Sequence, residues 1–243
     1  MKILALDSSG LVASVALLDG ESLLAEYTVN YKKTHSQTLL PMLDEIVKMT
    51  QTDLSDVDVI AVAAGPGSFT GLRIGSATAK GLGLALNKPL ISVPTLEGLA
   101  YNYEGSPYYI CPMMDARRSQ VYTGIYHFIY EDGQCKLEEL FQGCACAVSD
   151  VLEECNKLDG RLVFLGDGVP VYLEQIRGQV KVPYMIAPPH LSRQRAGAVA
   201  ERARVLYVSG RSESAAEHAP QYFRKSQAER ELEKKRTEES NIC

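Results

Sequence analysis

The sequence predicts an α/β protein of two similar lobes, in each of which a mixed sheet is flanked by helices. Residues 57–64 form a nearly continuous apolar, β-branched stretch, which is typical of a strand buried on both faces. A glycine-rich loop at 65–71 joins that strand to a helix. Residues 4–20 and 112–133 form a weak internal repeat, in which an apolar run ending in Asp is followed by a turn and a second run. Such a repeat indicates a duplicated unit.

The first lobe is predicted to span residues 1–103. It begins with three short strands separated by turn-forming residues, which indicates an antiparallel meander. These strands are expected at 2–8, 12–18 and 23–29. A helix through 39–47, the buried strand, the helix after the glycine-rich loop and a strand at 89–93 follow. The order β-β-β-α-β-α-β is that of one half of the actin, hexokinase and Hsp70 type of fold.

The two helices of this lobe carry local signals of their own. Thr34 and Gln37 form a candidate capping box for the first helix, although Pro41 should bend that helix or shift its start. The second helix, which ends near Asn87, has a small residue at every fourth position. These residues are Gly71, Gly75, Ala79 and Gly83. An interior glycine costs a helix about 1 kcal/mol against alanine, so close backbone approach is expected there. These four small residues form a ridge along one side of the helix. Either this ridge faces a partner protein, or it packs the helix against the sheet of its own lobe.

The second lobe is predicted to be smaller and to span residues 104–192. After the two strands of the repeat, it is expected to contain a helix near 148–155. A single further strand is expected at 161–165, and no second long glycine-bearing helix appears. The second lobe is therefore predicted to be a reduced copy of the first.

The C-terminal part of the chain is predicted to return to the first lobe. The returning segment spans about 193–219 and includes a helix at 193–209. The tail, residues 220–243, alternates charge at 225–236 and has no apolar stripe that a core would bury. The free end of this tail is therefore expected to be mobile.

Composition favours an ordinary soluble, cytoplasmic protein. Of 243 residues, 46% are hydrophobic and 23% are charged. No apolar stretch reaches the ~18 residues that span a bilayer, and the N-terminus begins a strand and not a signal peptide. The formal net charge is −5, so a strong nucleic-acid surface of its own is not expected. The six cysteines form no C-x-x-C pair and are expected to be reduced structural thiols.

Two turns are candidates for contact with a nucleotide between the lobes. In duplicated folds of this type, the turn after the first strand faces the phosphates, and its aspartate acts through Mg2+. That turn contains Asp7, Ser8 and Ser9, and a second candidate turn contains Gly166, Asp167 and Gly168. The alternative is a purely structural role, because phosphate turns usually carry more glycine than Ser8 and Ser9 provide.

The sequence shows no metal-ligand or catalytic motif. The loop at 65–71 resembles a phosphate cradle at a helix N-terminus, but it lacks the Lys-Ser/Thr ending of a P-loop. Arg73 and Lys80 are candidates to contact an anionic ligand or a partner carboxylate. The histidines His35, His127, His190 and His218 lie far apart in the sequence, and none forms a metal-ligand pair. No metal site and no catalytic residue are therefore predicted.

Several motifs along almost the whole chain are specific when they are taken together. They lie at 3–9, 35–43, 65–75, 80–83, 114–122 and 220–229. Together they resemble the TsaB family, non-catalytic subunits of the bacterial machinery that makes threonylcarbamoyladenosine in transfer RNA. This resemblance implies a scaffold or activator of threonylcarbamoyl transfer to the adenosine adjacent to the anticodon. The rival hypothesis is a stand-alone enzyme that binds or hydrolyses ATP through Asp7, Asp115 and the turn at Gly166.

The resemblance also implies that this chain is not itself an enzyme. The catalytic relative of the family, TsaD, is similar in its first lobe but has two metal-binding histidines four residues apart after the last strand of that lobe. Thr95 and Leu99 stand at the matching positions here. A hydroxyl and an alkyl group cannot replace two imidazoles on a metal. We therefore expect no cofactor of its own, with ATP, ADP and a divalent metal belonging to partner subunits.

Partners follow from the same resemblance. TsaB pairs with TsaD through two first-lobe helices of each protein, the ATPase TsaE joins the assembly, and transfer RNA is held indirectly through the complex. A homodimer through the same helices is the further expectation, and no membrane contact is expected. The candidate partner-binding residues are Leu39, Leu43, Ile46, Arg73, Gly75, Ser76, Ala79, Lys80 and Gly83.

Overall fold

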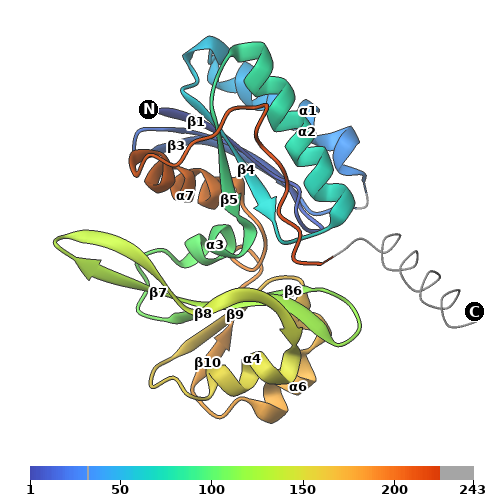
Figure 1. Cartoon of the computed structure of the whole chain (residues 1–243), viewed down its shortest axis with the longest axis vertical. Coiled ribbons are helices and arrows are strands. Elements are labelled where there is room, and N and C mark those ends of the chain that lie inside the picture. The colour runs from blue at the N-terminus through green and yellow to red at the C-terminus, as the bar shows by residue number, and fades with distance from the viewer. Residues whose placement is uncertain (32, 225–243) are drawn as a thin grey trace, which may run out of the picture.

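Two lobes make up the molecule, and they lie one above the other in Figure 1. The computed structural model describes residues 1–31 and 33–224 of the chain. The segment of alternating charge predicted at 225–236 lies outside the described residues. Within them, no helix is both long enough and apolar enough to cross a lipid bilayer.

The first lobe contains a five-stranded mixed sheet in the order β3-β2-β1-β4-β5. Its strands are β1 (Lys2–Asp7), β2 (Ala13–Asp19), β3 (Ser22–Val29), β4 (Val59–Gly65) and β5 (Leu90–Pro94). The first three strands form the predicted antiparallel meander, and β1, β4 and β5 run parallel to one another. Every residue of β4 is buried, as its continuous apolar sequence predicted.

Helices cover both faces of this sheet (Figure 1). Helices α1 (His35–Thr50) and α2 (Phe69–Leu86) lie on one face, and their apolar side chains share a core cluster with Leu4 and Leu6 of β1. Helix α7 (Ala196–Val208) lies on the other face, in a cluster with Ile3 and Ala5. Alternate residues of β1 thus serve opposite faces, as strand geometry requires. The C-terminal helix α7 thus packs on the sheet of the first lobe.

Helix α1 begins after Thr34, the residue that the sequence predicted as its cap, but the predicted side-chain capping bonds are not made. The capping box is absent, because the side chain of Thr34 makes no capping hydrogen bond and only its carbonyl oxygen accepts from the N–H of Gln37. Pro41 lies inside the helix and does not shift its start. The short 3-10 helix η1 (Leu54–Asp56) then leads into β4.

The second lobe repeats the topology of the first. Its strands lie in the order β10-β9-β6-β7-β8. They are β6 (Tyr109–Asp115), β7 (Gln120–Glu131), β8 (Gln134–Ala147), β9 (Leu162–Leu165) and β10 (Tyr184–Ile186). Strands β6, β7 and β8 form an antiparallel meander, and β9 and β10 run parallel to β6. The two sheets correspond strand by strand, which confirms the duplication that the sequence repeat indicated.

The prediction of a single further strand in this lobe is wrong, because β8 and β10 are also present. Strand β8 lies at the edge of its sheet and is mostly exposed or half-buried, so its sequence lacks a regular apolar pattern. Strand β10 has only three residues, which is too short for a periodic signal. The helix α4 (Val148–Cys155) is where it was predicted, whereas α5 (Gly168–Val171) and α6 (Leu173–Gln179) were not foreseen.

The two lobes are joined by α3 (Thr95–Ala100) and the short 3-10 helix η2 (Tyr101–Tyr103). Leu96 and Leu99 of α3 pack in one cluster with Met114 and Tyr126 of the second sheet. On the other side, the Arg202 guanidinium of α7 pairs with Glu97 at 2.6 Å. The connection between the lobes is thus a packed element of the core, and the sequence did not predict this helix.

Candidate functional site

A cavity of about 1160 Å³ lies between the lobes. The turn after β1, the start of α2 and the turn after β6 line it, and so do the last described residues, 222–224. Both turns that were predicted to contact a nucleotide reach this cavity, through Ser9 of the first and Asp167 of the second. The duplicated fold explains this meeting, because each turn follows a strand end that faces the other lobe.

In the first turn, Asp7 and Ser8 are already engaged within the chain. The buried carboxylate of Asp7 accepts hydrogen bonds from the N–H and the hydroxyl of Ser9, at 2.8 and 2.6 Å. Burial raises the pKa of Asp7 from 3.8 to about 6, against the smaller lowering effect of these hydrogen bonds. The Ser8 hydroxyl donates to the carbonyl oxygen of Gly71 at 2.9 Å. Ser8 therefore holds the start of α2 against the sheet.

In the second turn, the backbone at Gly166 lies very close to the backbone of Met113 in β6. Gly166 has a φ of +105°, and a Cβ there would overlap the carbonyl oxygen of Met113. Asp167 accepts a hydrogen bond from the N–H of Asp115 at 3.2 Å, and burial raises the pKa of its carboxyl group. Asp115 also lines the cavity and accepts from the hydroxyl of Tyr172 at 3.0 Å. Gly168 lies against the backbone of Met113 as well.

Thr95 and Leu99 have roles in packing. The buried Thr95 hydroxyl oxygen accepts a hydrogen bond from the N–H of Gly65 at 3.2 Å, which ties the start of α3 to the end of β4. Leu99 is buried in the cluster between the lobes. Among the described residues, no group of three or more His, Cys, Asp or Glu side chains is placed to hold a metal ion.

The second candidate site is the outer face of α1 and α2, and here part of the sequence-based prediction is wrong. Leu39, Leu43 and Ile46 of α1 were predicted to bind a partner, but all three are buried in the core of the first lobe. Together with Met42 they form the apolar stripe of α1. That stripe faces the sheet of its own lobe, because the sheet also needs cover on this face.

The ridge of small residues on α2 also faces inward. A Cβ on Gly75 would lie 2.6 Å from the Ser8 hydroxyl oxygen, and one on Gly83 would overlap the Leu90 side chain. Ala79 is fully buried, and Ser76 is buried as well. The partner-facing interpretation of Gly75, Ala79 and Gly83 is therefore wrong, and the alternative holds: the ridge seats α2 on its own sheet.

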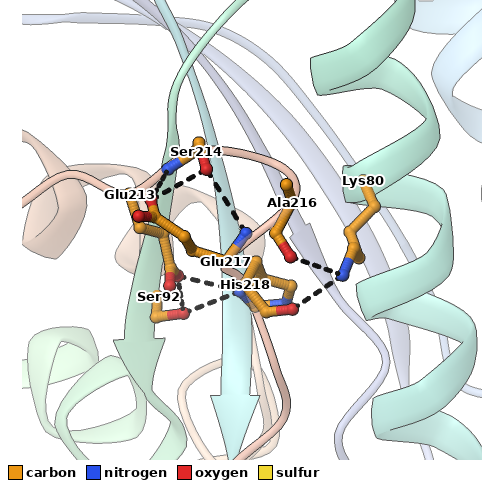
Figure 2. Close-up of polar contacts among 7 residues, drawn as sticks. All are labelled: Lys80, Ser92, Glu213, Ser214, Ala216, Glu217 and His218. Carbon is orange, nitrogen blue, oxygen red and sulfur yellow. Dashed lines mark hydrogen bonds and ion pairs between the residues drawn. The ribbon is translucent and has the colours of Figure 1, made fainter.

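The two cations of α2 hold the C-terminal segment of the chain. The Arg73 guanidinium lies 4.0 Å from the centre of the Phe69 ring and donates from Nε to the hydroxyl of Tyr222 at 3.3 Å. The Lys80 ammonium donates to the carbonyl oxygens of Ala216 and His218, at 3.3 and 2.9 Å (Figure 2). Arg73 and Lys80 were predicted to contact an anionic ligand or a partner carboxylate. In the structure, both donate to oxygen atoms of the C-terminal segment of this chain.

A different set of residues forms the exposed surface of these helices. Ala77, Gly81 and Ala85 are exposed and repeat every fourth position on α2, two residues out of step with the buried ridge. Around a Cβ on Gly81, the space is open to 4 Å among the described residues outside the helix backbone. Leu84 of α2 is 68% exposed, and α1, which lies beside α2 in Figure 1, exposes Leu40. The sequence signal for this surface was the second four-residue repeat of small side chains.

Figure 2 shows a serine, a histidine and a glutamate in contact, a combination that hydrolases use. The Nδ1 of His218 lies 2.9 Å from both the Ser92 hydroxyl and the Glu213 carboxylate. A catalytic triad places its serine and its acid on opposite ring nitrogens, so that one nitrogen can accept the serine proton. Here both groups meet the same nitrogen, and the His218 side chain is fully buried. This cluster therefore joins the segment at 213–218 to β5.

Two lobes of one topology with a cavity between them place this chain in the actin, hexokinase and Hsp70 class of folds. A solved structure of a Pseudomonas aeruginosa protein, described as similar to peptidase YeaZ, superposes with a TM-score of 0.77. It is 29% identical, and the match covers 92% of this chain and 99% of that one.

Sequence comparisons identify the family within this class. The family model "TsaD: tRNA N6-adenosine threonylcarbamoyltransferase" matches residues 22–232. The tRNA threonylcarbamoyladenosine biosynthesis protein TsaB of Bacillus subtilis is 37% identical over 72% of this chain and 75% of its own length. The Escherichia coli protein of the same name is 36% identical over 52% of this chain and 55% of its own length. The chain belongs to the TsaB family.

Proposed function

We propose that this chain is a non-catalytic subunit of tRNA threonylcarbamoyladenosine biosynthesis, which pairs with TsaD through α1 and α2 and thereby supports threonylcarbamoyl transfer. The observation that carries the proposal is the exposed row Ala77, Gly81 and Ala85 beside Leu84 on α2. In this complex TsaE supplies the ATPase, and the transfer RNA is bound through the assembly. A homodimer would use the same face and compete with TsaD.

The physical reason is that small side chains let two helices approach closely. Helices pack with their axes 8–10 Å apart, and the shorter distances need small residues at the contact. Exposed apolar side chains such as Leu84 and Leu40 gain free energy when a partner covers them. The buried ridge on the opposite side of α2 holds this helix rigidly on its sheet, so the outer face is presented in a fixed orientation.

Three observations support the non-catalytic role. Thr95 and Leu99 are engaged in packing at the positions that match the histidine pair of TsaD. Ser92 and Glu213 both meet the same ring nitrogen of the buried His218, an arrangement that cannot relay a proton from the serine. Asp7 has its carboxylate turned toward Ser9 of its own turn. The chain therefore contributes a surface to the reaction, and the chemistry belongs to TsaD.

The test uses two glycines that both have open space around a Cβ, Gly81 on α2 and Gly178 on α6. Gly81→Leu places a large side chain on the proposed interface, whereas Gly178→Leu makes the same change in the other lobe. With TsaD from the same genome, we expect Gly81→Leu to raise the Kd at least about tenfold, which corresponds to about 1.4 kcal/mol. The Kd of Gly178→Leu should equal that of the wild type. Equal affinity of both variants for TsaD would contradict the proposed interface.

The inter-lobe cavity favours a second candidate function, a nucleotide-binding or ATP-hydrolysing protein. Both candidate turns border it, and the pKa of Asp7 is raised by burial. The purified chain should turn over ATP in Mg2+ if this function is correct, and Asp7→Asn should abolish that turnover. The scaffold proposal predicts no turnover above the background of the same preparation of Asp7→Asn.

A further inference from the structure

Residues 213–224, which we call the C-terminal strap, run along the first lobe and end on the second. The strap begins at β5, where the backbone of Glu213 pairs with Leu90 in both directions, at 2.8 and 3.0 Å. His218 then contacts Ser92, and Lys80 of α2 holds the carbonyl oxygens of residues 216 and 218 (Figure 2). Because His218 is buried and these contacts come from two different elements, this part of the strap is firmly attached to the first lobe.

The middle of the strap is attached where β4 meets α2. The N–H of Gln221 donates to the carbonyl oxygen of Ala64 at 2.7 Å. Gly65 has a φ of +127°, and a Cβ there would overlap the carbonyl oxygen of Gln221. The strap backbone thus lies directly on the glycine-rich loop. The Tyr222 ring then packs on the ring of Phe69, with centroids 4.7 Å apart, in the first turn of α2.

The end of the strap is attached to the second lobe. The ring of Phe223 meets Tyr122 of β7 edge to face, with centroids 6.2 Å apart. The Arg224 guanidinium donates from Nη1 to the carbonyl oxygen of Ala116, in the turn after β6, at 2.8 Å. Residues 221–224 therefore contact the first lobe at one end and the second lobe at the other, and residues 222–224 form one wall of the inter-lobe cavity.

The other described connections between the lobes lie elsewhere. They come from α3, from α7 and from the loop at 187–195, where Arg193 donates to the carbonyl oxygen of Gly166 and Asn102 donates to that of Leu191. Each of these connections leaves the two lobes some freedom to rotate, and a further attachment at the wall of the cavity restricts that freedom. A strap supplied by the same chain has no translational entropy to lose on binding, so a few contacts are sufficient.

We propose that the C-terminal strap fixes the separation of the two lobes and the width of the cavity between them, with Tyr222 and Arg224 as positioning residues. The strap also links α2 to the second lobe, because Arg73 and Lys80 attach it to that helix. This role is a property of the isolated chain and does not depend on TsaD.

The experiment measures the distance between the lobes in the full chain. Unnatural amino acids that carry spin labels replace Ala77 of α2 and Ser149 of α4, which are both exposed. This labelling leaves the native cysteines unchanged. Double electron-electron resonance then gives the distance distribution. We expect a single narrow distribution for the wild type and one at least about twofold broader for Tyr222→Ala/Arg224→Ala. A narrow distribution in that variant would overturn the proposal.

Two further variants separate positioning from general damage. The conservative pair Tyr222→Phe/Arg224→Lys keeps the ring contact and a donor for Ala116, so its distribution should stay narrow. The control pair Tyr130→Ala/Arg177→Ala removes an exposed aromatic ring and an exposed cation of the second lobe, and equal broadening there would also overturn the proposal. If the strap double variant does not fold, the distance distribution is measured in Arg224→Ala, which removes the hydrogen bond to Ala116. A broader distribution than in the wild type then supports the proposal, and an equally narrow one overturns it.

Discussion

Gly75 of α2 lies so close to Ser8 that a Cβ at Gly75 would be 2.6 Å from the serine hydroxyl oxygen. That hydroxyl in turn donates to Gly71, one turn earlier in the same helix. This contact holds α2 against β1 and β4 through the side of the helix that carries the small residues Gly71, Gly75, Ala79 and Gly83. The opposite side, with Gly81 at its centre, is therefore the side that α2 presents to its surroundings.

Gly75→Leu should destabilise the fold by about 3 kcal/mol or more, because the added side chain has no space between α2 and the sheet. Gly81→Leu should leave the free energy of unfolding unchanged or raise it by about 0.5–1 kcal/mol, since leucine favours a helix over glycine. Urea unfolding of the two variants beside the wild type measures both effects. Equal stability of the two variants would show that the orientation of α2 is wrong.

The exposed side of α1 should belong to the same interface. Leu40→Glu places a charge where we expect a partner to cover an apolar side chain, and it should raise the Kd for TsaD at least about tenfold. Because Leu40 is exposed, the melting temperature of the isolated chain should change little. Leu140→Glu, at an exposed position of β8, is the matched control. If both variants bind TsaD equally well, α1 is outside the contact.

The stability of the fold should depend on the protonation of Asp7. Burial raises the pKa of its carboxyl group from 3.8 to about 6, so between about pH 4 and pH 6 the folded chain keeps a proton that the unfolded chain has released. The contribution of this group to the free energy of unfolding therefore falls as pH rises through this window. Above it, the buried charge is unfavourable by an amount on the order of 3 kcal/mol.

Asp7→Asn should remove this dependence, because asparagine has no proton to lose and still offers an oxygen to the N–H of Ser9. Relative to the wild type, the variant should be more stable at pH 7.5 than at pH 4. Asp132→Asn, in the exposed turn between β7 and β8, is the control. Parallel pH profiles of wild type and Asp7→Asn in urea unfolding would contradict a raised pKa.

Lys80 should hold the C-terminal strap on α2. Lys80→Met keeps the aliphatic stem but removes the donor for the carbonyl oxygens of Ala216 and His218. We expect amide hydrogen exchange at residues 213–218 to become about thirtyfold faster, because the two lost hydrogen bonds contribute about 1 kcal/mol each. Lys157→Met, at an exposed position of the second lobe, should leave this exchange unchanged. Unchanged exchange in Lys80→Met would mean that other contacts suffice.

The first lobe could be predicted almost completely from the sequence. Its strands are either continuously apolar, as β4 is, or separated by clear turn residues, and these local patterns survive in the fold. The period of α2 indicated a helix with a side of small residues, but not which neighbour that side meets. This choice depends on Ser8 and Leu90, which are distant in sequence. The buried residues of α1 were assigned to a partner for the same reason.

The second lobe and the strap show where local patterns are insufficient. Strand β8 is an exposed sheet edge, and its pairing with β7 depends on register and not on hydrophobicity. The two candidate turns were predicted to meet between the lobes, and both border the same cavity. The contacts of Tyr222 and Arg224 were not foreseen, because they join residues about 150 and 108 positions apart in a segment without regular structure.

The most direct measurement is the formation of threonylcarbamoyladenosine by TsaD and its partner subunits, assayed by mass spectrometry of transfer RNA nucleosides, with each variant of this chain added in turn. We predict little product without the chain, full product with the wild type and with Gly178→Leu, and strongly reduced product with Gly81→Leu. Full product with Gly81→Leu, or with the chain left out, would contradict the account of this chain as a subunit that supports TsaD through the outer face of α1 and α2.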